Sequence, residues 1–306
     1  MTSRIEPVGK EPSPILVRTH ALEKSFGNHR VLRGVDLQVR EGAIYGFLGR
    51  NGAGKTTAIQ ILMGIQKPNR GWIQLFGEWV KHPTINQKRH IGYVSQEQFF
   101  YPWMTCRSLG RFVGRFYPDW DGHWFDTLMG RFDLPKKRKI GQLSQGMRVK
   151  LALALALAPR PRVLILDEPT AGLDPAARRE FLEILGHRAA ADGLTTFFST
   201  HIVEEVDRIA NRIGILASGR LRYQGNLAVL KRQVRRLSTG RLSPKEMQRL
   251  VPAGMRVLNR RPQKGYWTLM GPSGVWEELA GRGHDTMALS LEDIFLSMTV
   301  EGMESR

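Results

Sequence analysis

The chain of 306 residues carries 46 lysines and arginines against 28 acidic residues, a net charge of +18, and 42% of its residues are hydrophobic. This length can bury one large α/β core with a smaller second unit, which excludes a small disulfide-stapled scaffold. The longest uninterrupted apolar run, residues 151–158, is too short to cross a membrane.

The N-terminal segment contains charged residues and three prolines but no apolar stretch. We therefore expect residues 1–14 to form a disordered lead-in and not a secretion signal, which predicts a cytosolic protein. The single cysteine, Cys106, cannot form a disulfide within the chain, and this fits a reducing compartment.

Short strands are expected between residues 15 and 48, where apolar and polar stretches alternate with a glycine at each break. The next segment, 49–57, reads GRNGAGKTT and opens the helical pattern of residues 55–63. A strand, a glycine-rich turn and a helix are the context of a phosphate-binding loop, whose backbone N–H groups point at the phosphates. Lys55 would reach the terminal phosphates, and the Thr56 hydroxyl would bind Mg²⁺.

Helices and strands alternate through the middle of the chain. We expect strands at 91–96, 163–166 and 195–200 and helices at 107–116, 124–132, 144–158, 176–190 and 202–210. This alternation predicts a mainly parallel sheet covered by helices.

Two acidic residues, Asp167 and Glu168, end the apolar strand VLIL. Beside a phosphate loop, one acid can orient Mg²⁺ and the other can activate the attacking water, and Glu168 is the candidate general base. If the strand continues, the two side chains point to opposite faces. A solvated strand edge or a helix cap is the alternative for both acids.

A strongly basic second unit follows the alternating region. Between residues 218 and 264 there are thirteen lysines and arginines and one acid, Glu246, a net charge of +12, which attracts phosphates of lipid or nucleic acid. We expect a helix from Asn226 with an apolar side made of Leu227, Leu230, Val234 and Leu237. Its basic side would lie on an anionic membrane or simply face solvent. Ser290 and Asp293 have capping-box spacing and predict a last packed helix.

Together these motifs resemble the ATP-binding subunit of ABC transporters over about residues 15–225. The elements in order are GRNGAGKTT, VSQ with Gln96, LSQGM at 143–147, VLILDEPT, AGLDP at 171–175, and His201 after TTFFST. The resemblance implies an α/β P-loop NTPase cassette with a RecA-like mainly parallel core, an antiparallel β subdomain and a helical signature subdomain at about 97–158. A small basic α+β extension at 226–306 would follow it.

The resemblance also implies a role for each site residue. Glu168, His201 and Gln96 would be catalytic, and Thr56, Gln96 and Asp167 would hold Mg²⁺. The residues that would bind ATP are Phe26, Gly49, Asn51, Gly52, Gly54, Lys55, Thr56, Thr57, Ser144, Gly146 and Asp174. His201 would contact the γ-phosphate, and Asp174 would communicate across a dimer. Phe26 would stack on adenine, with a core phenylalanine as the alternative.

The LSQGM segment departs from the LSGGQ form that is commonest in the family, because Gln145 and Met147 replace a glycine and a glutamine. Ser144 and Gly146 remain, and by resemblance they bind a γ-phosphate held by the opposite subunit. One chain thus contains both halves of the site. A homodimer with two working sites or a heterodimer with a related cassette would follow, closed by ATP and opened by hydrolysis.

The segments FYPDWD, at 116–121, and LALALALA, with GM in the signature, resemble the bacterial export-type branch, in which the cassette works with a separate multi-span permease at the cytoplasmic face of the membrane. By the same resemblance, the aromatic segment FFYPWMTCR, at 99–107, lies where the groove for the permease's coupling helix would be. The aromatic residues would either dock the permease or lie in the core. The alternative function is a soluble ABC-type ATPase acting on nucleic acid or ribosomes. The basic stretch favours it, and the single cassette and the lack of an RNA-binding aromatic platform disfavour it.

Overall fold

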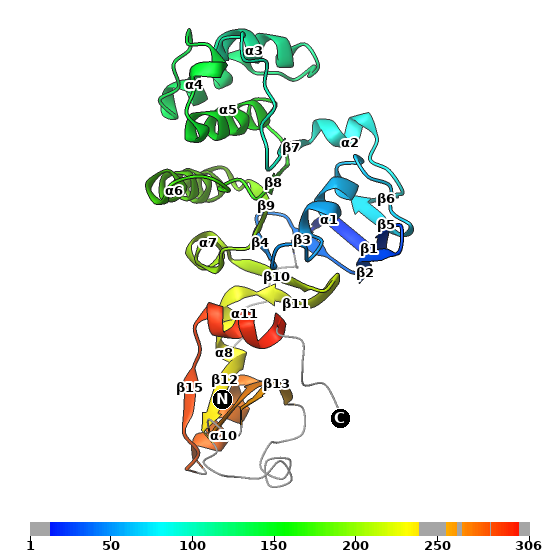
Figure 1. The fold of residues 1–306 in the computed structure, drawn as a ribbon, viewed down its shortest axis with the longest axis vertical. Coiled ribbons are helices and arrows are strands. Elements are labelled where there is room, and N and C mark those ends of the chain that lie inside the picture. The colour runs from blue at the N-terminus through cyan, green and yellow to red at the C-terminus, as the bar shows by residue number, and fades with distance from the viewer. Residues whose placement is uncertain (1–12, 239–254, 262–264, 282, 300–306) are drawn as a thin grey trace, which may run out of the picture.

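The computed structural model describes residues 13–238, 255–261, 265–281 and 283–299 (Figure 1). Most of the predicted lead-in at 1–14 lies outside these ranges. So do four basic residues of the 218–264 stretch, namely Arg241, Lys245, Arg249 and Lys264. Within the described ranges, no helix has the length and apolar character needed to span a membrane.

A six-stranded sheet forms the centre of the molecule, in the order β11-β10-β4-β9-β8-β7. Its strands are β4 (Ile44–Leu48), β7 (Ile91–Val94), β8 (Val163–Asp167), β9 (Thr195–Thr200), β10 (Arg212–Ala217) and β11 (Arg220–Asn226). All neighbours pair in parallel except β11, which forms an antiparallel hairpin with β10. The predicted mainly parallel sheet is confirmed.

Helices cover both faces of this sheet. Figure 1 shows α1 (Lys55–Leu62) on one side and α6 (Pro175–Asp192) and α7 (Val203–Ile209) on the other. Strand β8 serves both cores, because Ile165 packs on the side of α1 and Leu164 and Leu166 pack on the side of α6. Burial on both faces explains why this strand is apolar at every position before its terminal acid.

A five-stranded antiparallel sheet packs against the other side of α1. Its strands are β1 (Ile15–Phe26), β2 (His29–Val35), β3 (Gln38–Arg40), β5 (Arg70–Leu75) and β6 (Glu78–Val80), and α2 (Ile85–Arg89) follows them. The hairpin of β1 and β2 ends with Phe26 opposite His29. This sheet therefore holds Phe26 on the same side of the central sheet as the helix that follows the phosphate loop.

A helical unit lies between β7 and β8. It consists of α3 (Cys106–Gly114), α4 (Gly122–Arg131), the 3₁₀ turn η1 (Ile140–Gln142) and α5 (Gln145–Leu157). Ser144 caps α5, and all residues of the LALALALA run are buried, so this helix packs on most of its surface. The fold predicted from the resemblance, a parallel core with an antiparallel sheet and a helical unit, is confirmed.

The C-terminal extension contains a four-stranded sheet in the order β13-β14-β12-β15. Its elements are α8 (Leu227–Gln233), β12 (Val234–Ser238), β13 (Arg256–Arg261), β14 (Tyr266–Met270), α10 (Ser273–Gly281), β15 (Thr286–Ala288) and α11 (Leu291–Thr299). The predicted helix from Asn226 is right only as far as Gln233. Val234 and Leu237 belong to a strand instead, because they pair with Met270 and Trp267 of β14.

The last helix, α11, joins the extension to the rest of the chain. Ser290 caps it as predicted, with Asp293 N–H donating to the Ser290 hydroxyl at 3.1 Å. Its buried residues Ile294 and Phe295 belong to the same core as Val206 of α7 and Ile213 of β10. The described part of the extension is thus packed onto the cassette through a shared apolar core.

We predict that Phe295→Ala lowers the stability of the whole chain by about 3 to 5 kcal/mol, because it removes a buried ring and leaves a cavity in this shared core. Phe295 is 6% exposed, whereas the adjacent Leu296 is 46% exposed. Leu296→Ala should therefore change stability by less than about 1 kcal/mol. Urea unfolding of both variants measures the difference, and equal losses would contradict the packing of α11 described above.

Candidate nucleotide-binding site

The glycine-rich loop runs from the end of β4 to the start of α1, as the sequence predicts. Gly54 has a φ of +107°, and a Cβ there would lie 2.8 Å from Cδ2 of Leu32 and 3.1 Å from the Val31 carbonyl oxygen. Gly52 also has a positive φ, +77°. Side chains at these positions would strain the backbone or clash, so only glycine lets the loop curl at the N-terminus of α1. This is the cradle that a phosphate chain needs.

Lys55 is the first residue of α1, and only 4% of it is exposed. Its Nζ donates to the carbonyl oxygens of Gly49 at 2.8 Å and Arg50 at 3.2 Å. The same atom lies 3.0 Å from Oε1 of Glu168. The loop therefore encloses a positive charge that already contacts a carboxylate, and this charge can interact with phosphate oxygens in the same cradle.

Asp167 is the last residue of β8 and is buried. Its Oδ1 accepts hydrogen bonds from the hydroxyls of Ser199, at 2.7 Å, and Thr56, at 3.1 Å. Burial raises the pKa of the Asp167 carboxyl. The two hydroxyl hydrogen bonds oppose that rise, and the neighbouring Glu168 adds to it. Thr56 and Asp167 together offer adjacent oxygen ligands, which fit Mg²⁺ because this ion usually takes one or two protein ligands beside phosphates and waters.

Glu168 does not continue the strand, because its φ of +43° places it in the left-handed region. The sequence predicts side chains on opposite faces only for a strand that continues through Glu168. Because β8 ends at Asp167, that condition is not met. The Glu168 N–H donates to the Ser199 hydroxyl at 3.0 Å, and its carboxylate lies between two partners. One is Lys55, and the other is His201, whose Nδ1 is 3.1 Å from Glu168 Oε2. The structure thus brings Lys55, Glu168 and His201 together.

Two other predicted residues lie at the margins of this cluster. Gln96 follows the end of β7 and is exposed, at the carboxyl edge of the central sheet where β8 also ends. Phe26, at the tip of the β1–β2 hairpin, is 47% exposed, and the ammonium group of Lys24 lies 4.8 Å from its ring centroid. The alternative of a core phenylalanine is wrong, because nearly half of Phe26 is free to meet a ligand.

Asn51 lies in the phosphate loop and Thr57 in α1, whereas three further predicted residues, Ser144, Gly146 and Asp174, lie at the starts of α5 and α6. The Ser144 hydroxyl caps α5 by accepting from Met147 N–H at 3.3 Å, and the Asp174 carboxylate caps α6 by accepting from Ala176 and Ala177 N–H at 2.9 Å. At Gly146 a Cβ would lie 3.6 Å from the Ala177 Cβ. The starts of α5 and α6 are therefore adjacent, and both Ser144 and Asp174 are exposed there.

Sequence reasoning missed several polar residues behind the site. Ser199 bonds both acids, as described above. Thr170 and Thr200 both donate to the carboxylate of Glu205, with oxygen separations of 2.6 Å. The sequence does contain an indication of this network, namely the threonines and serine of TTFFST, because this strand is buried at every position. Buried hydroxyls must be hydrogen-bonded, so their presence in an apolar strand indicates a polar network.

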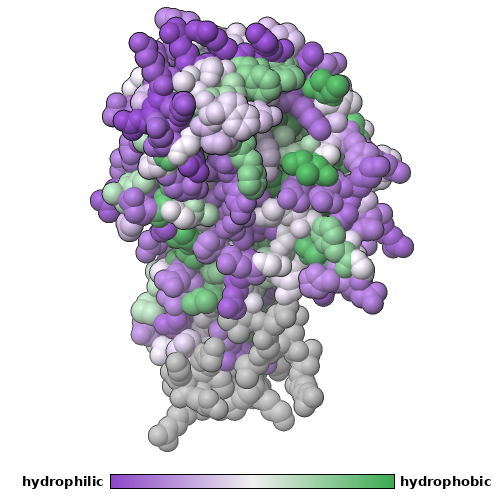
Figure 2. Space-filling model, turned by 45° about the horizontal axis from the view of Figure 1, so that its top comes forward, coloured by the Kyte–Doolittle hydropathy of each residue, from purple (hydrophilic) through white to green (hydrophobic). Residues whose placement is uncertain are grey.

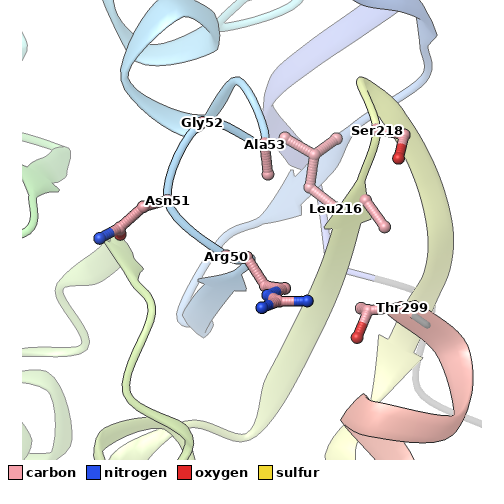
Figure 3. Close-up of a pocket in the computed structure, with 8 residues that line it drawn as sticks. Arg50, Asn51, Gly52, Ala53, Leu216, Ser218 and Thr299 are labelled. Atoms are coloured by element: carbon pink, nitrogen blue, oxygen red, sulfur yellow. The ribbon is translucent and has the colours of Figure 1, made fainter. Parts of the chain in front are cut away.

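A pocket of about 510 Å³ lies beside the phosphate loop (Figure 3). One wall is the loop itself at residues 50–53, and another is the end of β10 at residues 216–217 with the following Ser218. Thr299, at the end of α11, completes the lining. Figure 3 shows the Arg50 side chain extending between the loop and Thr299. The C-terminal helix therefore ends within reach of the phosphate loop.

Comparisons with known proteins agree with this geometry. The family model described as ABC transporter matches residues 32–171. The ABC transporter ATP-binding protein YtrB of Bacillus subtilis is 33% identical over 71% of this chain and 74% of its own length. The bacitracin transport ATP-binding protein BcrA of Bacillus licheniformis is 34% identical over 74% of this chain and 75% of its own length. A solved ATP-binding subunit of an ABC transporter superposes with a TM-score of 0.64 at 27% identity, over 71% of this chain and 92% of that one.

We predict that Asp167→Asn raises the melting temperature of the nucleotide-free protein in EDTA at neutral pH. The folded protein holds the Asp167 proton more tightly than an unfolded aspartate, whose pKa is 3.8. Burial of the charged carboxylate therefore destabilises the fold as pH rises through the raised pKa, and asparagine removes this cost.

The gain from Asp167→Asn should shrink as pH falls through the raised pKa of Asp167 toward 3.8, the unfolded value, and melting curves across this range measure it. Asp119→Asn, at an exposed position, is the control and should show no such trend. A melting temperature for Asp167→Asn that is unchanged or lower at neutral pH would contradict the assigned cause.

Proposed function

The chain belongs to the ABC transporter family as an ATP-binding subunit with ATPase activity, and from this membership we propose that it drives export through a separate multi-span permease. ATP would close a dimer of cassettes, and hydrolysis would open it. The observation that carries the proposal is the meeting of Lys55, Glu168 and His201 beside the Thr56–Asp167 pair.

The chemistry proposed for this site is attack of water on the γ-phosphate. The phosphate chain would lie in the loop at the N-terminus of α1, with Lys55 turning its charge toward the terminal oxygens. Glu168 would accept the proton of the attacking water, and His201 would hold Glu168 on one side and contact the γ-phosphate on the other. Mg²⁺, held by Thr56 and Asp167 with Gln96 near the attacking water, would neutralise phosphate charge. Phe26 would stack on adenine.

The dimer proposal rests on the exposed starts of α5 and α6. Ser144 presents a hydroxyl and Gly146 presents a backbone without a side chain, while Asp174 lies at the adjacent helix start. Within the described residues, the side chains of Ser144 and Asp174 accept hydrogen bonds from the starts of their own helices. These groups would bind the γ-phosphate held by a second copy, or by a related cassette, and each closed dimer would then contain two composite sites.

An exposed aromatic cluster supports a membrane partner. Phe99, Tyr101, Trp103, Phe112 and Phe116 are all exposed. The ring centroid of Tyr101 lies 5.2 Å from that of Trp103 and 6.0 Å from that of Phe112, and the centroids of Phe112 and Phe116 are 5.4 Å apart. For the segment 99–107, the alternative of core burial is therefore wrong for Phe99, Tyr101 and Trp103, whereas Phe100 is partly buried against the core. The surface in Figure 2 is largely hydrophilic, with separate hydrophobic patches. A concentration of exposed aromatic rings is typical of a protein-binding surface, and we assign it to the permease.

The direction of transport is inferred from relatives. BcrA is named for bacitracin transport, and a Burkholderia lata protein that is 36% identical over 67% of this chain is named for Nod factor export. We propose export for this chain too, from a peripheral position at the cytoplasmic face of the membrane where the permease would hold it.

We predict that Glu168→Gln retains ATP and accumulates as a dimer, while its rate of hydrolysis falls by about 10² to 10⁴, the usual effect of removing a general base. Size-exclusion chromatography with MgATP and a phosphate-release assay measure the two effects. Lys55→Ala should instead lose nucleotide affinity and remain monomeric. Full turnover by Glu168→Gln would refute the role given to this residue.

We predict that Trp103→Ser weakens binding of the membrane protein that copurifies with the wild-type chain by about tenfold or more, the loss expected for an interface hot spot. ATP affinity should be unchanged, because the Trp103 side chain is 68% exposed and its ring lies against Tyr101, in the unit between β7 and β8. Trp79→Ser is the matched control, since Trp79 is also exposed but lies on the antiparallel sheet. Equal retention of the membrane protein by both variants would place the docking surface elsewhere.

A further inference from the structure

Glu205 is an acidic residue in the first turn of α7, and only 1% of it is exposed. Both carboxylate oxygens are used. Oε1 accepts from the Thr170 hydroxyl and Oε2 accepts from the Thr200 hydroxyl, each at 2.6 Å. A buried carboxylate is costly unless it is hydrogen-bonded or paired, so these bonds constrain the segments that supply the hydroxyls.

Each hydroxyl belongs to a segment that carries a reactive side chain. Thr170 lies two residues after Glu168, and Thr200 directly precedes His201. The Thr200 hydroxyl also accepts from the Ile202 N–H at 2.9 Å. It therefore links the residue before His201 to the residue after it, and Glu205 holds this hydroxyl in place. One carboxylate therefore joins the loop after β8 to the residue from which the loop after β9 begins.

A third segment reaches the same carboxylate. Arg178 lies in the first turn of α6, and its Nε is 3.5 Å from Glu205 Oε1. The Nε–H makes no aligned hydrogen bond, so this contact is a pairing of charges between a partly exposed arginine and a buried carboxylate. Asp174 caps the same helix turn. Glu205 thus links the two loops of the catalytic cluster to the start of α6, which faces the second cassette in the proposed dimer.

The backbone at Glu168 explains why such a link matters. A non-glycine residue with a φ of +43° is held in a sparsely populated conformation, which persists only where the surroundings determine it. The Ser199 hydroxyl holds the N–H of Glu168 from one side. Thr170, anchored to Glu205, holds the segment that leaves Glu168 on the other side.

We propose that Glu205 is a positioning residue for ATP hydrolysis. It keeps Glu168 and His201 in contact and couples both to the start of α6, without itself touching the nucleotide. This inference rests on the proposed roles of Glu168 and His201. It implies that loss of the carboxylate impairs the chemical step and leaves nucleotide binding in the phosphate loop intact.

Steady-state hydrolysis of MgATP by the full chain tests this inference through the variants Glu205→Leu and Glu205→Gln. Glu205→Leu should lower kcat by about 10- to 100-fold, the effect of a small misplacement of reacting groups, while KM stays within about twofold. Glu205→Gln should recover most of kcat, because its amide oxygen can accept from one hydroxyl while its NH₂ group donates to the oxygen of the other. Glu204→Leu, at the exposed neighbouring position, should behave as the wild type.

Two smaller substitutions keep the test decisive if Glu205→Leu does not fold. Thr170→Val and Thr200→Val each remove one hydroxyl, and each should lower kcat by about three- to tenfold with KM unchanged. Where the variants fold, combining either with Glu205→Leu should add little further loss, because both changes break the same contact.

The outcomes separate the two levels of the proposal. A folded Glu205→Leu with wild-type kcat, or threonine variants with wild-type kcat, would overturn the role of Glu205 while leaving the proposed function in place. Parallel changes in KM and kcat, with no recovery in Glu205→Gln, would indicate a purely structural role and would also overturn it. If the wild-type chain itself shows no magnesium-dependent hydrolysis, the proposed function fails and this inference fails with it.

Discussion

The register of three neighbouring parallel strands determines where the reactive groups of this protein lie. Leu48, just before the phosphate loop, pairs with Thr200, just before His201, and Asp167 pairs with Ser199. Because parallel strands present their carboxyl ends at one edge of a sheet, this pairing brings a lysine, two acids and a histidine from distant parts of the chain into contact. A shift of one residue in either pairing would displace the segments that carry these side chains relative to one another.

Much of the site was predictable, because its main parts are short contiguous motifs. Three motifs can each be recognised from a short stretch of sequence: the loop at 49–57, the acids at 167–168 and the histidine after TTFFST. The contacts of Ser199 and Glu205 were not predictable, since they depend on strand register and on how α7 packs. The same limit explains the misplaced end of the helix at Asn226. Val234 fits an amphipathic helix by spacing, but pairing with a strand more than thirty residues later decides its conformation.

Charge is used inside the extension as well as on its surface. The guanidinium carbon of Arg236 lies 4.2 Å from the ring centroid of Tyr266, and its Nη2 lies 3.6 Å from Asp293. The guanidinium carbon of Arg260 lies 5.0 Å from the ring centroid of Trp267. Arginines that stack on aromatic rings and pair with acids stabilise their own domain. Part of the excess positive charge in this region therefore has an internal partner, which weakens the case for an RNA-binding surface built from composition alone.

The position of α11 has a consequence for how the protein is made. This helix is the last described element of the chain, yet it covers apolar side chains of α7 and β10 and helps line the pocket beside the phosphate loop. During translation the cassette must therefore leave the ribosome with that surface bare. The apolar surface of α7 and β10 stays exposed until α11 has been synthesised and has docked. A nascent chain in this interval exposes an apolar surface to other proteins and is the form that most needs a chaperone.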